Sequence, residues 1–211
     1  MNRDFDRTAE HEGPYTISSD VFLRVESRLW RNEDKIEYMY KYKKGNITVV
    51  IGFLLPNRET AARYFWRDRK TLRTVTKDFV RSQWDLISTK PKGFSAPYYK
   101  KFTSIELSYA TIRSEFLKTL GQVHDKLRDI FVTADFDTFP PPVQEALLDL
   151  AWNTATHDFE GEWPELTKAA KRWDWFEAAR QSHRDSDDVP EWRNTETKEL
   201  ILQGIDFDRK P

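Results

Sequence analysis

The sequence contains no cysteine, which excludes a disulfide framework and any zinc site built on thiolates. It also lacks long apolar runs, so we expect no membrane-spanning segment. Glycine is scarce, with 7 among 211 residues, and neither a glycine-rich phosphate loop nor a nucleophile elbow is present. These absences argue against metal–thiolate centres, nucleotide-phosphate loops and serine nucleophiles.

The sequence also has no excess of basic or of acidic residues. The chain has 34 basic and 35 acidic side chains, a formal net charge of -1. A chain without a net positive charge has no global attraction to nucleic acid, so we predict that nucleic acid is not a partner. The histidines His11, His124, His157 and His183 show no metal-ligand spacing. We therefore expect neither a metal nor another cofactor.

The N-terminal segment has no apolar core of the kind that secretion signals carry. Residues 1–16 are polar and show no periodicity, and we interpret them as a flexible tail. Residues 17–211 suit one domain, because 8 Trp, 8 Tyr and 14 Phe supply enough apolar area for a core. We expect synthesis in the cytoplasm without a Sec signal, so that action in the periplasm or cell wall would need another delivery route.

Hydrophobic spacing predicts one helix, a small sheet and then many helices. Turn residues between two β-prone runs indicate a hairpin in the stretch from Met39 to Pro56. The expected elements are a helix over 19–30, a hairpin over 36–55, and helices from 58 onward, over 74–87, 104–131, 143–153, 163–172, 175–182 and 194–204.

This order favours an α+β fold that is mainly α. We predict a small hairpin lobe at about 31–56 and a larger helical lobe at about 57–205. The helix over 143–153 is apolar on nearly every side, as is typical of a helix in the centre of a core.

A loop at 89–97 interrupts the helical pattern and is closed by two aromatic and two basic residues, Tyr98, Tyr99, Lys100 and Lys101. Two interpretations of this group stay open. It is either part of an ordinary surface loop or a contact for a glycan or another polyanion.

Several ordered motifs resemble the phage-type lysozymes, glycoside hydrolase family 24, and their pesticin-like muramidase branch. The first is Glu26 on a helix, followed by a hairpin with Thr48 on its return strand. The second is the run from Phe139 to Asn153, which resembles the family's core helix with its Gln-x-Ala-Leu pattern. Further matches lie at 163–166, 172–179 and 193–196, so the resemblance covers about 18–204.

The resemblance implies a lysozyme-like fold and a peptidoglycan muramidase. Such an enzyme hydrolyses the β-1,4 bond between N-acetylmuramic acid and N-acetylglucosamine with two carboxyl groups, or with one carboxyl group and a positioned water. By position, Glu26 matches the general acid and Thr48 the water-positioning threonine. A phage lysin or an antibacterial toxin or effector would fit this activity, with peptidoglycan glycan strands and an immunity or carrier protein as partners.

The chain departs from the family pattern at the second carboxylate. Tyr42 stands where phage lysozymes have the catalytic aspartate, and it is instead a candidate for substrate binding. Glu37 is the candidate replacement acid, with Glu33 and Asp34 nearby in the same connector. Asn153, at the end of the core helix, either ends that helix or lines the saccharide cleft.

Other substitutions around the expected site also replace polar residues by apolar ones. Phe53 stands at the family's histidine, and Leu54 stands where the pesticin branch has its aspartate. The alternative interpretation is therefore a catalytically inactive lysozyme-fold module that binds a glycan or a protein, or that serves as a structural component.

Overall fold

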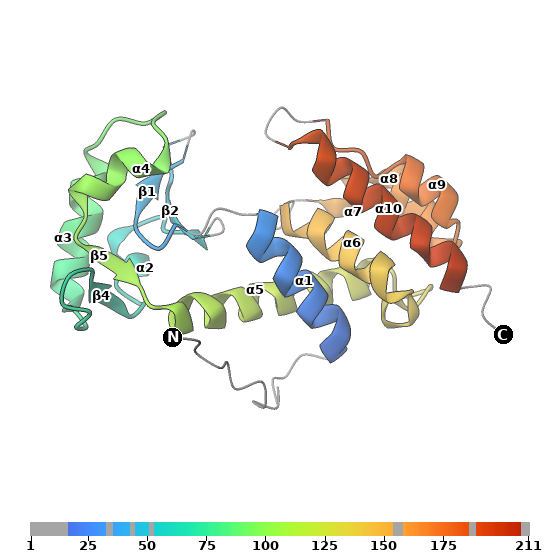
Figure 1. Cartoon of the computed structure of the whole chain (residues 1–211), viewed down its shortest axis with the longest axis horizontal. Coiled ribbons are helices and arrows are strands. Elements are labelled where there is room, and N and C mark those ends of the chain that lie inside the picture. The colour runs from blue at the N-terminus through green and yellow to red at the C-terminus, as the bar shows by residue number, and fades with distance from the viewer. Residues whose placement is uncertain are drawn as a thin grey trace, which may run out of the picture. The chain divides into compact units, whose positions relative to one another are not determined.

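The computed structural model describes residues 17–32, 36–42, 45–50, 53–153, 158–185 and 189–207 (Figure 1). The expected tail at 1–16 lies outside these residues, as do Glu33 and Asp34. The chain forms two compact units, one made of 29–119 and the other of 1–28 together with 120–211. The unit that contains the hairpin, which we call the strand unit, is thus larger than the lobe expected at 31–56. We call the other the helical unit.

The strand unit contains two small antiparallel sheets. The first has the order β1–β2–β3, formed by Tyr40–Lys41, Ile47–Val49 and Phe53–Leu54. Thr48 pairs with Tyr40 on one side and with Leu54 on the other. The predicted hairpin is therefore confirmed, and a third short strand extends it. The fold is mainly helical with small antiparallel sheets, as expected.

The second sheet was missed by the sequence analysis. It pairs β4 (Trp66–Asp68) with β5 (Ile105–Leu107), so that Trp66 lies opposite Leu107. The helix expected from 58 onward ends after one turn, α2 (Arg58–Ala61). Trp66 is 1% exposed, and its indole Nε1 donates a hydrogen bond to the carbonyl of Ala61 at 2.8 Å. Burial of this ring in a tertiary contact outweighs the local helical spacing.

The next part of the strand unit agrees more closely with the predicted ranges. α3 (Lys77–Ser88) begins at the N-cap Thr76, whose side chain accepts a hydrogen bond from the Phe79 amide. The expected loop at 89–97 is followed by a short helix, α4 (Ala96–Tyr99), and a 3-10 turn, η1 (Lys100–Phe102).

The long helix expected over 104–131 begins later than predicted. Its first residues form β5 instead, and the helix proper is α5 (Tyr109–Ile130), which continues through Gly121. The side chains at 105 and 107 are both buried, which is the alternation of a strand, since two residues apart in a helix would lie on opposite sides. α5 carries the chain from the strand unit into the helical unit.

The helical unit consists of the first part of α1 (Ser19–Asn32), the end of α5 and the C-terminal helices. Its helix α6 is buried along nearly its whole length, as predicted, and packs against α10. Gln144 of α6 donates from Nε2 to the carbonyls of Phe139, at 2.7 Å, and Asp137, at 3.2 Å, which fixes the chain entering the helix. The C-terminal elements are η2 (Phe136–Thr138), α6 (Pro141–Asn153), α7 (Phe159–Glu162), α8 (Pro164–Lys171), α9 (Trp175–Arg180) and α10 (Glu191–Phe207).

A buried ionic cluster holds this unit together around Asp149 of α6. The carboxylate is fully buried and is contacted by Arg184 Nη2 at 2.6 Å, Arg193 Nη2 at 2.8 Å and Arg28 Nε at 3.5 Å. Arg28 also donates to Glu196 and Thr197, both at 3.0 Å. The cluster therefore ties α1, α6, α10 and the segment after α9 to one another.

The charge state of Asp149 follows from these contacts. Burial by itself would raise its pKa, but the hydrogen bond from Arg193 and the charges of Arg193, Arg184 and Arg28 favour the carboxylate, so its pKa lies below the ordinary value. The group is thus ionised in the folded protein, and it is the counter-ion of guanidinium groups that are themselves buried.

Replacing Asp149 by asparagine should destabilise the protein by about 3–5 kcal/mol, because buried arginines would lose their counter-ion. Urea denaturation followed by tryptophan fluorescence measures this change. The matched control is Asp206→Asn on the exposed side of α10, which should change the free energy of unfolding by less than about 0.5 kcal/mol. An equal loss in both variants would contradict a specific role for the cluster.

Candidate functional site

Glu26 lies on α1 in the helical unit and is partly exposed. Its neighbour Val25 is fully buried, and Arg28, two residues later, is bound inside the Asp149 cluster. Two residues correspond to about 200° around a helix, so the inward position of Arg28 directs Glu26 away from the cluster. The side chain is therefore held on a helix whose rotation is fixed by its buried face.

Thr48 lies on β2 in the strand unit and is 4% exposed. Its hydroxyl donates a hydrogen bond to the carbonyl oxygen of Phe53 on β3, at 2.9 Å. The hydroxyl proton is thus used within the sheet, while the oxygen lone pairs stay available as acceptors. A water held by Thr48 would have to donate its proton to this oxygen.

Tyr42 follows β1 directly and begins the turn that leads to β2. Its amide donates to the carbonyl of Asn46, and its carbonyl accepts from the amide of Gly45, both at 2.8 Å. Gly45 has a φ of 93°, a value that disfavours residues with a Cβ. Tyr42 is 45% exposed, so part of its aromatic side chain faces solvent.

The remaining candidates are placed as follows. Asn153 is the last residue of α6, and its side chain lies outside what the structure describes. Phe53 and Leu54 form β3, and Leu54 is half exposed. Glu26 and Asn153 belong to the helical unit, whereas Thr48, Tyr42 and Glu37 belong to the strand unit.

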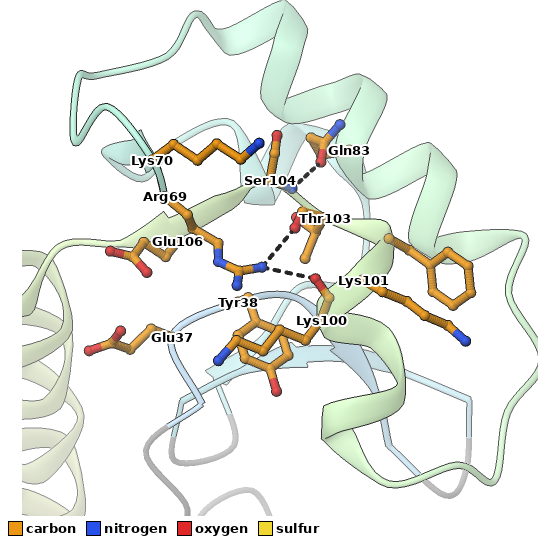
Figure 2. Close-up of a pocket in the computed structure, with 11 residues that line it drawn as sticks. Glu37, Tyr38, Arg69, Lys70, Gln83, Lys100, Lys101, Thr103, Ser104 and Glu106 are labelled. Carbon is orange, nitrogen blue, oxygen red and sulfur yellow. Dashed lines mark hydrogen bonds between the residues drawn. The ribbon is translucent and has the colours of Figure 1, made fainter.

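Glu37 lines a pocket that the sequence analysis did not identify. This pocket has a volume of about 650 Å³ and lies within the strand unit. Its walls come from the segment before β1, the turn after β4, and the stretch from η1 to β5 (Figure 2). The sequence signal that pointed to it was the basic and aromatic group at 98–101, of which Lys100 and Lys101 line the pocket.

Arg69 occupies the middle of this pocket, as Figure 2 shows. Its Nη1 donates to the carbonyls of Lys100, at 2.9 Å, and Thr103, at 3.0 Å. The guanidinium also lies 5.7 Å from the centre of the Tyr38 ring, and the Lys100 ammonium lies 5.8 Å from the same ring. Backbone carbonyls and one aromatic face therefore hold the guanidinium in a fixed orientation.

Basic side chains outnumber carboxylates in the lining of the pocket. Glu106 is paired with Arg67 at 2.8 Å. Within the part of the chain that the structure describes, no carboxylate lies at ion-pair distance from Arg69, Lys70 or Lys100. Figure 2 shows the carboxylates of Glu37 and Glu106 on the same side of the pocket. The arrangement is suited to an acidic group that also carries N–H donors.

Among the described residues, no group of three or more acidic or histidine side chains is placed to hold a metal ion. No helix in the described ranges combines the length and apolar character needed to cross a membrane. The chain matches no protein-family model, no curated protein and no solved structure.

The hydrogen bond of Thr48 gives a testable consequence for stability. Thr48→Val should cost about 1 kcal/mol, because it removes the hydroxyl donor from a partly buried hydrogen bond to the Phe53 carbonyl. Thr48→Ser, which retains the hydroxyl, is the matched control and should retain that hydrogen bond. Thermal unfolding of both variants measures the difference. Equal stability of the valine variant and the wild type would show that the bond contributes nothing.

Proposed function

We propose that this protein is a peptidoglycan muramidase of the phage-lysozyme kind, with Glu26 as the general acid. The observation that carries the proposal is the place of α1 in the chain. This helix bears Glu26, belongs to a helical unit otherwise formed by residues after 119, and is followed directly by the β1–β2–β3 sheet. The order of a helix-borne acid, a small sheet, a long helix and a buried core helix supports the resemblance in the sequence.

The roles proposed for Glu26 and Thr48 follow from the chemistry of their side chains. Glycosidic cleavage needs a proton for the leaving oxygen and a nucleophile for the sugar centre. Glu26 supplies the proton, and a water bound at the Thr48 oxygen is the nucleophile. Since a threonine cannot take the proton of that water, an acidic residue such as Glu37 would have to act as base, or the reaction would be slow.

Muropeptide release from purified peptidoglycan tests the proposal. Glu26→Gln should lower the rate at least about a hundredfold, because general acid catalysis contributes on this scale. Glu199→Gln, an exposed position on α10, is the matched control and should retain the wild-type rate. Release that is unaffected by Glu26→Gln would remove Glu26 from the mechanism, and a folded wild type without release would contradict the proposal.

A second candidate function is favoured by the surroundings of Thr48 and Tyr42. The threonine hydroxyl is bound to backbone, and the exposed Tyr42 ring stands where an acid is expected. Both features suit a lysozyme-fold module that binds a glycan or a protein without cleaving it. An exposed tyrosine can stack on a sugar ring.

The variant Tyr42→Asp distinguishes the two candidates. If the protein is a muramidase, a carboxylate at this position should raise muropeptide release at least about tenfold, because it supplies the missing base. Tyr42→Asn, which has nearly the same shape without the charge, is the matched control. Release by the aspartate variant from an inactive wild type would favour the binding module, since the fold would then be competent and only the acid absent.

A further inference from the structure

The two compact units carry opposite charge, although the whole chain is nearly neutral. Residues 29–119 contain 19 Lys and Arg against 9 Asp and Glu, a formal charge of +10. The residues of the helical unit contain 15 basic against 26 acidic side chains, a formal charge of -11. Such a separation directs an anionic ligand to the strand unit.

The pocket around Arg69 is the point in this positive unit where an anion can be held by fixed donors. Arg69 is oriented by two backbone carbonyls and by Tyr38, so little side-chain entropy would be lost on binding. Lys70 and Lys100 are exposed, and in the described part of the chain neither lies at ion-pair distance from a carboxylate, although the charge of Lys70 acts on the nearby Asp68. A volume of about 650 Å³ suits a small group rather than a polymer backbone.

The surroundings of the pocket favour a carboxylate on a peptide over a nucleic acid. Glu37 and Glu106 line the same pocket and would repel a continuous phosphate backbone, whereas they can accept N–H groups of a peptide. The ring of Tyr38 is covered by cations, and the ring of Phe102 faces Lys90 at 4.6 Å and Lys101 at 5.0 Å. These rings are therefore not open platforms for stacked bases.

We propose that this pocket binds a carboxylate of the peptide stems of peptidoglycan, and that the strand unit is the part of the protein that attaches to the wall polymer. Arg69 and Lys100 contact the carboxylate, Lys70 adds positive charge, and Glu37 accepts peptide N–H groups. The choice of peptidoglycan rests on the proposed function, whereas the choice of an acidic peptide rests on the pocket.

Sedimentation with purified peptidoglycan, stripped of phosphate polymers, tests this site. All measurements use the Glu26→Gln background, so that binding is observed whether or not the wild type hydrolyses the glycan. The double variant Lys70→Glu/Lys100→Glu should weaken binding at least about tenfold. The matched control Lys77→Glu/Lys118→Glu makes the same charge change at exposed positions of the strand unit outside the pocket, and should weaken binding less than about threefold.

Further comparisons identify the ligand. Peptidoglycan whose carboxylates have been amidated should no longer bind, and binding should fall with salt because the contact is ionic. Equal losses in the two double variants would overturn the pocket and leave only general charge. Binding that requires the phosphate polymers, or that is found with a short DNA duplex and not with stripped peptidoglycan, would overturn the carboxylate proposal.

The proposed function and this inference can fail separately. If the wild type releases muropeptide while binding in the Glu26→Gln background is insensitive to Lys70→Glu/Lys100→Glu, the pocket is contradicted and the muramidase stays intact. Binding that depends on the pocket, in a protein that releases no muropeptide, would support the pocket and contradict the muramidase. Circular dichroism of each variant verifies that binding and muropeptide release are measured on folded protein.

Discussion

The buried carboxylate of Asp149 is the constraint on which the helical unit depends. It binds arginines from the N-terminal helix, from the segment after α9 and from α10, and the first of these lies far from the other two in the sequence. A buried charge without partners is costly, so these segments must meet for any of them to be satisfied. Because Arg28 is one of the partners, the same cluster fixes the rotation of α1 and with it the direction of Glu26.

Charge is distributed between the compact units in a way that whole-chain composition conceals. A net charge of -1 argued against nucleic acid as a partner, but it is the sum of a strongly positive strand unit and a strongly negative helical unit. Only the division into compact units makes this separation visible, since one unit combines both ends of the chain. The charge around a binding site, rather than the total charge, decides which ligands are attracted to it.

Periodicity predicted the amphipathic and fully buried helices well and the short strands poorly. α1, α3, α6 and α10 appear within a few residues of their expected bounds, because long apolar stripes are a strong signal. The strands β4 and β5 were assigned to helices, since three residues are too few to separate the two periods. Their pairing depends on a partner nearly forty residues away in the sequence.

The sequence by itself determined the mainly helical class, the sheet after the first helix, the core helix α6 and the residues worth testing, because these follow from local pattern and from ordered motifs. It did not determine that the Thr48 hydroxyl binds the Phe53 carbonyl, that Glu37 and Arg69 share a pocket, or that Asp149 is surrounded by arginines. Those facts depend on contacts between distant segments. Such contacts are decided by the packing of the whole unit, which no local pattern encodes.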